Sequence, residues 1–532
     1  MNKFYFITFA VLALWTGQSK AQTQVDSMSF HKDYFPGQND INGRYLGSTE
    51  TMAIVQHKGK LFAGMGNWMD YPITLQSEGT QVLKKDSYNS PWVVDTTVGY
   101  SSLRSQALIS ATFEKDYLGN TLTTPVNLLV GGFGDILPPR WVSTWVRNDT
   151  TGIWHSTDIL QVSSEAGIRS FCMHTDQVTQ KQWLFCGVTA GSIVKVGYDP
   201  TAPGMVYPDA TQELSGQGRV MAMAECNGNL YAAAVVEIVG TDTIGGLYKR
   251  IDGLNPSWQL VYRWPFEQGT NEKNTFRGLT CIPNPQNPNE NVLIGTRYGQ
   301  VEIINPNLNH QVTTEFNFRN YFGNLWYGGT YQPSVSIAAY NQFYPDTLNG
   351  SPIWWFGLWV VHPNGMNHPH NGSYFMQRNL SGQYKLGHIY DNAHPVPSGE
   401  ALRGTRTIVK SPFPEDSSLV YYFGGYDCAG DTSNNTAWIY KGVLANLTTG
   451  INENYLLSDI SIYPNPVSDF ITIDSEAHLS RYKIFDAQGR IIQTGEITGG
   501  DKIYLSHLRQ GIFFLQLQGG TGSFKTFKLI KQ

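Results

Sequence analysis

The chain has 532 residues, of which 41% are hydrophobic and only 15% charged, and its formal net charge is −5. This length exceeds what a single hydrophobic core usually serves, so we expect more than one folded unit. The slightly negative charge gives no general attraction to nucleic acid, and we expect no nucleic-acid partner. The 54 Gly, 29 Tyr and 14 Trp residues favour an all-β protein over a helical bundle.

Residues 1–21 have the pattern of a signal peptide. Lys3 supplies a positive charge, an apolar stretch runs from Phe4 to Trp15, and small residues stand at Ser19 and Ala21 where cleavage would occur. The apolar stretch is too short to span a bilayer, and no later stretch approaches about 18 uninterrupted apolar residues. We therefore expect an exported chain that begins at Gln22 and has no transmembrane helix.

A run of apolar residues that ends in a small residue recurs seven times. The small residues are Gly64, Gly131, Gly187, Ala233, Gly295, Gly357 and Gly424. The runs alternate or are continuously apolar without a 3.6-residue period, which is typical of strands. About four strands in each repeat of roughly 50–65 residues is the pattern of a propeller blade. The sequence predicts an all-β fold with a seven-bladed β-propeller over residues 22–445; six or eight blades remain alternatives. Residues 25–46 would complete the last blade beside Trp438–Lys441.

Five copies begin with an arginine. These are Arg104, Arg169, Arg219, Arg277 and Arg403, whereas copies one and six have Thr51-Met52 and Ser334-Val335 instead. Arg suits bidentate recognition of carboxylate or sulfate, so the five are candidate ligand-binding residues for an anionic glycan. The alternative is that each Arg pairs with a carboxylate or carbonyl of a neighbouring blade, and the repetition favours this structural role.

Several copies also end with an aromatic residue that follows a strand and a polar turn. The clearest examples are Trp92, Trp154, Trp258 and Tyr384. Such residues could stack on sugars, but in a blade they more often serve packing.

Five cysteines occur, at Cys172, Cys186, Cys226, Cys281 and Cys428. None forms a Cys-x-x-Cys pair, so we expect no zinc site, and the sequence indicates neither another metal nor a cofactor. Cys172 and Cys186 flank a predicted hairpin and could be bridged if the register allows. The favoured interpretation is that the cysteines are buried free thiols on strands, because Cys is among the most often buried residue types.

Five of the twelve histidines lie between His362 and His394, next to the irregular sixth copy. His368 and His370 lie on the same face of an extended chain, a spacing that suits a metal site or a catalytic base and its partner. One hypothesis is β-elimination on an acidic polysaccharide, which needs a base, an acid and a group that neutralises the carboxylate. Candidates for those roles are His368, His370, Tyr374, Tyr390 and Arg403. The simpler interpretation is a polar loop between strands.

After an expected linker over residues 446–456, short alternating strands separated by Gly, Asn-Pro and Asp turns predict a small Ig-like β-sandwich. The pieces, in order, are Ile460–Val467, Tyr482–Asp486, Gly489-Arg490, Gly511–Leu515 and Phe527–Lys531. This order resembles the type A C-terminal sorting domain of the type IX secretion system, over residues 457–532. The resemblance implies the secretion machinery as a partner, passage across an outer membrane, and release or attachment at the cell surface. The alternative is an Ig-like accessory domain.

The function that these patterns favour is a secreted or cell-surface module that binds a glycan or a protein without catalysis. The expected partner is an anionic polysaccharide or a surface protein. The alternative is a propeller-type lyase of acidic polysaccharides.

Overall fold

The computed structural model describes most of the chain. The described residues are 23–24, 28–67, 79–99, 102–135, 137–215, 218–268, 274–327, 335–337, 343–360, 374–389, 404–416, 419–426, 435–444, 460–474, 479–486, 490–498, 500–519 and 524–532. The chain divides into two compact units, residues 1–445 and 446–532. The described elements are almost all strands, with one short α-helix, α1 (Phe318–Tyr327), and one 3₁₀ turn. Among the described residues, no helix is long and apolar enough to cross a membrane.

The described strands of the first unit pair antiparallel in groups, which we call sets 1 to 7 in chain order. Set 1 is β5 (Glu50–His57), β6 (Lys60–Gly66), β7 (Gln81–Lys85) and β8 (Val93–Thr97). Set 2 is β9 (Ser102–Lys115), β10 (Thr121–Asp135), β11 (Arg140–Arg147) and β12 (Trp154–Val162). Set 3 is β13 (Ile168–Thr175), β14 (Gln182–Val188), β15 (Ile193–Tyr198) and β16 (Val206–Leu214).

Set 4 is β17 (Val220–Cys226), β18 (Asn229–Val239), β19 (Asp242–Ile251) and β20 (Ser257–Arg263). Set 5 is β21 (Arg277–Asn284), β22 (Asn287–Arg297), β23 (Gln300–Asn305) and β24 (Gln311–Asn317). Set 6 begins with an interrupted strand, β25 (Val335–Ile337) and β26 (Tyr344–Leu348), and continues with β27 (Ser351–Val360), β28 (Tyr374–Asn379) and β29 (Tyr384–His388). Set 7 is β30 (Gly404–Lys410), β31 (Val420–Tyr426), β32 (Trp438–Leu444) and β2 (Met28–Lys32).

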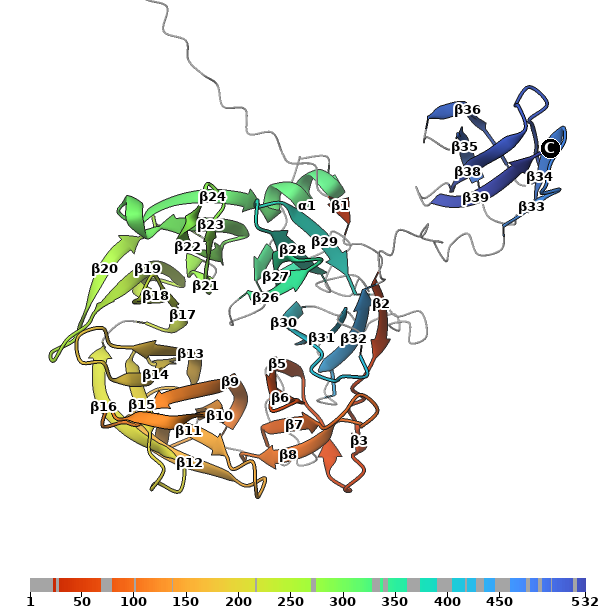
Figure 1. The fold of residues 1–532 in the computed structure, drawn as a ribbon. Coiled ribbons are helices and arrows are strands. Elements are labelled where there is room, and N and C mark those ends of the chain that lie inside the picture. Colours follow the sequence, from red (N-terminus) through yellow and green to blue (C-terminus); the bar gives the residue numbers. More distant parts are fainter. Residues whose placement is uncertain are drawn as a thin grey trace, which may run out of the picture. The chain divides into compact units, whose positions relative to one another are not determined.

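The sets stand around a common centre, with β5, β9, β13, β17 and β30 on the inside (Figure 1). Single bridging pairs link some neighbouring sets, for example Gly66 with Arg104 and Tyr426 with Glu50. Two short N-terminal pieces lie outside this scheme. β1 (Thr23–Gln24) pairs with β29, and β3 (Gln38–Asn39) pairs with β4 (Tyr45–Leu46).

The last set is completed from the other end of the chain, as the sequence predicts. Met28 pairs with Leu444 and Lys32 with Tyr440, so β2 is the outer strand beside β32. The prediction that residues 25–46 complete the last set beside Trp438–Lys441 is therefore confirmed for Met28–Lys32. This pairing joins the N-terminal and C-terminal ends of the first unit through backbone hydrogen bonds.

The small residue at the end of several apolar runs has a steric reason. A Cβ at Gly357 would lie 1.8 Å from the backbone oxygen of Thr405 in set 7, and one at Gly64 would lie 2.4 Å from Ser105 in set 2. Both contacts are with the first strand of the next set. Glycine is needed here because neighbouring strands approach too closely for a side chain. Apolar clusters, such as Phe62, Leu108 and Leu129, fill the space between sets.

The favoured prediction of buried free thiols is confirmed for Cys172 and Cys186 and wrong for Cys226 and Cys281. Cys172 and Cys186 are free and buried, because the register pairs Cys186 with Phe171 and places the two thiols on opposite faces of the hairpin. Burial raises the pKa of Cys172 to about 12. The disulfide that does form joins Cys226 on β17 to Cys281 on β21, across sets 4 and 5. Cys428 lies outside the described residues.

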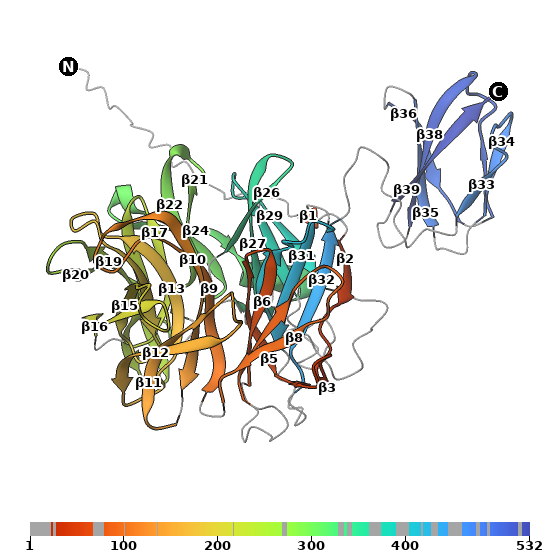
Figure 2. The same ribbon diagram turned by 60° about the horizontal axis from the view of Figure 1, so that its bottom comes forward.

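The second unit has two sheets that face each other (Figure 2). One contains β33 (Ser461–Tyr463), β34 (Phe470–Asp474) and β37 (Lys502–Tyr504). The other contains β36 (Ile491–Glu496), β35 (Leu479–Phe485), β38 (Gly511–Gly519) and β39 (Phe524–Lys531). Residues of both sheets, including Ile471, Ile484 and Leu515, share one buried core.

Replacing Cys226 and Cys281 together by Ser is expected to lower the free energy of unfolding of the first unit. The two cysteines are 55 residues apart in sequence, and loop entropy gives a loss of about 4 kcal/mol for a loop of that size. Urea denaturation measures the loss. A reductant should shift the wild-type midpoint toward that of the double variant and leave the variant unchanged. A wild-type curve that does not respond to reductant would contradict the assignment.

Candidate functional site

A cavity of about 350 Å³ lies at the centre of the first unit. The first strands of sets 1, 2, 3, 4 and 7 line it, together with the adjoining part of set 6. Its wall is mostly apolar and includes Ile54, Leu108, Phe171, Met223, Phe343 and Ile408. A few polar side chains also line it, among them Gln56, Ser110 and Tyr344. An apolar hollow with a few convergent polar groups is the usual form of a small-ligand site.

A buried ion cluster adjoins this cavity. The carboxylate of Glu50 on β5 lies 2.8 Å from Nη2 of Arg406 in set 7 and 3.3 Å from Nε of Arg104 in set 2. All three side chains are buried, and Arg406 also lines the cavity. The guanidinium of Arg406 stacks over Tyr426 at 4.3 Å. Glu50 of set 1 thus lies between an arginine of set 2 and an arginine of set 7.

The other predicted arginines lie on the first strands or just before them. Arg169 is buried on β13, and Arg277, at the start of β21, is half-buried. Arg219 precedes β17 and is also half-buried. Arg403 lies outside the described residues. The prediction that the five arginines bind an anionic ligand stays a prediction, and Arg104 has Glu50 as its charge partner.

Of the residues predicted for a lyase, only Tyr374 lies in the described part of the chain. It is buried, with its ring 5.3 Å from Phe322 and 4.8 Å from His388. Burial raises the pKa of Tyr374 to about 12. Tyr374 therefore packs in an apolar cluster of set 6. His368, His370, Tyr390 and Arg403 lie outside the described residues.

A recurring contact that the sequence did not reveal joins neighbouring sets. In set 2, Arg147 at the end of β11 pairs at 2.8 Å with Asp95 on β8 of set 1, and Trp154 Nε1 donates to the same carboxylate at 2.7 Å. In set 1, Lys85 and Trp92 contact Asp33, which directly follows β2 of set 7. We call this arrangement the inter-set clasp.

Two further sets repeat the clasp with small changes. In set 6, Arg378 donates two hydrogen bonds of 2.7 Å to Glu315 on β24 of set 5, and the hydroxyl of Tyr384 donates to the same carboxylate. In set 4, Arg250 on β19 binds Glu213 on β16 of set 3 at 2.7 and 3.0 Å. The bidentate geometry is the strong form of an Arg–carboxylate pair.

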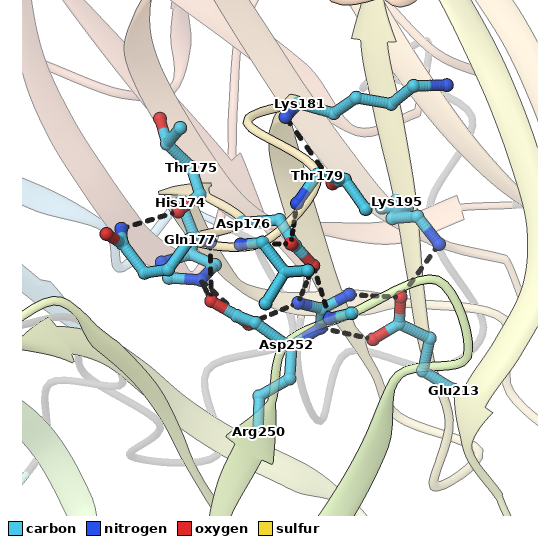
Figure 3. Close-up of polar contacts among 12 residues, drawn as sticks. His174, Thr175, Asp176, Gln177, Thr179, Lys181, Lys195, Glu213, Arg250 and Asp252 are labelled. Atoms are coloured by element: carbon cyan, nitrogen blue, oxygen red, sulfur yellow. Dashed lines mark hydrogen bonds and ion pairs between the residues drawn. The ribbon is translucent and has the colours of Figure 1, made fainter.

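Arg250 is the centre of the largest of these networks (Figure 3). Besides Glu213 it donates to Asp176 at 2.8 Å and to Asp252, and Lys195 binds Glu213 from the other side at 2.8 Å. Burial alone would raise the pKa of Glu213, but Arg250 and Lys195 outweigh it and lower the pKa. Each charged group of the network thus has an opposite charge beside it, which is what buried ionic groups need.

Two histidines occupy matching places at the ends of first strands. His57 of set 1 lies 2.9 Å from Asp149 of set 2, and His174 of set 3 lies 2.7 Å from Glu225 and 3.1 Å from Asp252 of set 4. Burial lowers the pKa of His57, and Asp149 does not offset this. Burial also opposes protonation of His174, but its two carboxylates outweigh it and raise the pKa.

Comparison with known families identifies the second unit. Residues 461–532 match the family model of the secretion system C-terminal sorting domain. This unit is a type IX sorting domain. The domain implies an interaction with the type IX machinery, and the protein is exported and is either secreted or attached at the cell surface. No curated protein sequence matches the chain.

Solved structures with a similar arrangement share little sequence with this chain. The extracellular domain of the hybrid two-component system BT4673 from B. thetaiotaomicron has 12% identity and a TM-score of 0.44. The match covers 96% of this chain but only 60% of that domain. The α-L-arabinofuranosidase Arb93A from Fusarium graminearum has 10% identity and a TM-score of 0.35, with 80% and 99% coverage. The Trypanosoma rangeli sialidase has 10% identity and a TM-score of 0.34, with 95% and 89% coverage.

Replacing Arg250 by Met is expected to lower the free energy of unfolding by about 3–5 kcal/mol, because it leaves buried carboxylates without their partner. The matched control is Arg263→Met in the same set. Arg263 pairs with Glu237, and the two side chains are 49% and 51% exposed, so its loss should cost less than about 1 kcal/mol. Chemical denaturation of both variants measures the difference. Equal effects of the two substitutions would show that the buried network does not stabilise the fold.

His174→Gln and His57→Gln are expected to respond to pH in opposite directions. The raised pKa of His174 means that its stabilisation is present below about 6.5 and is lost as pH rises through its folded-state pKa. The lowered pKa of His57 means that its contribution is present above about 6.5 and declines as pH falls. The free energy of unfolding is measured at several pH values between about 5 and 8. Relative to wild type, it should fall more for His174→Gln at the acidic end of this range and more for His57→Gln at the basic end. The same pH trend in both variants would contradict this assignment.

Proposed function

We propose that the first unit is a seven-bladed β-propeller that binds a glycan or a protein outside the cell without catalysis. Two observations support the propeller. The described strands of residues 28–444 fall into seven sets around one centre, and β2 completes the last set. Propellers commonly use such N-terminal strands to close the ring and avoid exposed sheet edges. On this proposal the propeller occupies residues 22–445, and residues 446–456 link it to the sorting domain.

The observation that carries the binding role is the axial cavity. Its volume of about 350 Å³ falls within the range of about 300–1,000 Å³ that is usual for small-ligand pockets. Half-buried side chains such as Val55, Gln56 and Ile109 line it, so part of its wall is open to a ligand. The cavity is large enough for the terminal sugar of a glycan or for one side chain of a peptide.

The charges beside the cavity favour recognition by shape over recognition by net charge. Glu50 pairs with both Arg104 and Arg406 inside the protein, so an anionic ligand would have to compete with a buried carboxylate for them. Breaking such a pair is costly. The inter-set clasps support the proposal in a second way, because a rigid frame holds the cavity wall in place before the ligand arrives.

The test is a glycan array probed with the mature, full-length protein and two variants. Ile109→Trp would narrow the cavity, whereas Leu254→Trp adds the same side chain at a position that is 88% exposed. We expect binding by the wild type and by Leu254→Trp, and at least a tenfold loss with Ile109→Trp. Equal binding by both variants would contradict the axial site.

A parallel assay addresses catalysis. Any glycan that binds is incubated with the protein, and new unsaturated or reducing ends are followed over time. The proposal predicts that none accumulate. Steady formation of unsaturated ends would instead support a polysaccharide lyase.

A further inference from the structure

A second, smaller pocket lies on set 2, away from the axial cavity. Its volume is about 160 Å³. The residues that line it are Val98, Ser102, Phe133, Asp135, Trp141, Ser143, Trp145, Ser156 and Asp158. None of these residues lines the axial cavity. They come from β9, β10, β11 and β12, and Val98 directly follows β8.

Strand alternation explains how the wall is built. Trp141, Ser143 and Trp145 are two residues apart on β11, so their side chains lie on one face of the sheet. On β12, Asp158 pairs with Ser143 and Ser156 pairs with Trp145. The hydroxyl of Ser143 donates to Asp158 at 2.5 Å. An indole, a hydroxyl and a carboxylate thus lie within one strand spacing of each other.

The two indoles are held differently. Trp145 is half-buried, and its ring meets Phe133 edge to face at 5.6 Å between centroids. Trp141 is 36% exposed. A fixed inner ring and an open outer ring provide a flat apolar wall that a ligand can reach. Exposing a tryptophan side chain to water is unfavourable in free energy, because its large apolar area favours burial.

The pocket also has polar groups. Asp135, Asp158 and three serines supply acceptors and hydroxyl groups beside the indoles. The ligand that matches is itself two-sided, with a ring face of C–H groups for the indoles and hydroxyls for the carboxylates. A pyranose ring has this character, and the pocket is smaller than the about 300 Å³ that larger ligands need.

The charge of the pocket selects among sugars. Its described lining contains two acids and no basic residue. Carboxylates repel a uronic acid or a sulfated sugar, and pairing like charges in a partly buried site is unfavourable. We propose that this pocket is a subsite for a neutral monosaccharide unit of a glycan, with Trp141 and Trp145 against the ring and Asp158 accepting from its hydroxyls. This site shares no lining residue with the axial cavity, so it goes beyond the function proposed above.

The experiment measures the affinity of the mature, full-length protein for soluble β-glucan, mannan and galactan, with alginate as the acidic comparison. The variants are Trp141→Ala and Asp158→Asn, both at exposed positions that should tolerate substitution. Tyr207→Ala is the matched control, because it removes an aromatic ring that is 42% exposed on set 3. Circular dichroism and a thermal midpoint for each variant verify that the fold is retained.

We expect at least one neutral glycan to bind, with at least a tenfold loss for Trp141→Ala, a several-fold loss for Asp158→Asn, and less than a twofold change for Tyr207→Ala. Trp141→Phe should recover part of the loss, because a flat ring is restored. Binding of none of the neutral glycans, or binding that Trp141→Ala leaves unchanged, would overturn the proposal.

The axial variant separates this proposal from the previous one. Ile109→Trp should leave neutral-glycan binding at set 2 intact. A loss with Ile109→Trp but not with Trp141→Ala would support the axial cavity and reject the set 2 subsite. The reverse result would support the subsite alone.

Discussion

The fold of the first unit depends on buried carboxylates shared between neighbouring strand sets. Each clasp takes its acid from one set and its base from the next, as in Asp95 with Arg147 and Glu315 with Arg378. A buried charge without its partner is strongly destabilising. The clasps therefore favour the register in which neighbouring sets meet. The cavity wall is built from the first strands of the same sets.

The sequence predicts the repeating frame well because the frame has local causes. The apolar run and its small final residue lie within four positions, and Gly357 shows why the final residue must be small: the next strand touches it. The completion of the last set by β2 is predicted because an unpaired strand must precede the first repeat. The sorting domain is predicted for a different reason, since its pieces occur in a fixed order near the end of the chain.

The contacts between sets are not predicted, because their partners are far apart in sequence. Trp92 and Trp154 each donate to a carboxylate 59 residues earlier, and no local pattern marks that acid. The sequence does contain a pattern for the basic and aromatic members of the clasp. Lys85 precedes Trp92 by seven residues, and Arg147 precedes Trp154 by the same interval. Similarly, the repeat pattern makes Arg104 a candidate ligand residue, whereas its pairing with Glu50 follows only from the folded structure. The favoured prediction of free thiols holds for Cys172 and Cys186, because the register that would decide a bridge pairs Cys172 with Phe185.

The most direct test of this account is a double-mutant cycle on one clasp, with Arg147→Met, Asp95→Asn and the double variant compared with wild type by chemical denaturation. If the clasp joins sets 1 and 2, the two substitutions must be coupled, and we predict an interaction energy of about 1–3 kcal/mol. The two single variants each lose some free energy of unfolding. If these losses sum to the loss of the double variant within about 0.5 kcal/mol, the two residues act independently and buried ion pairs do not hold the sets together.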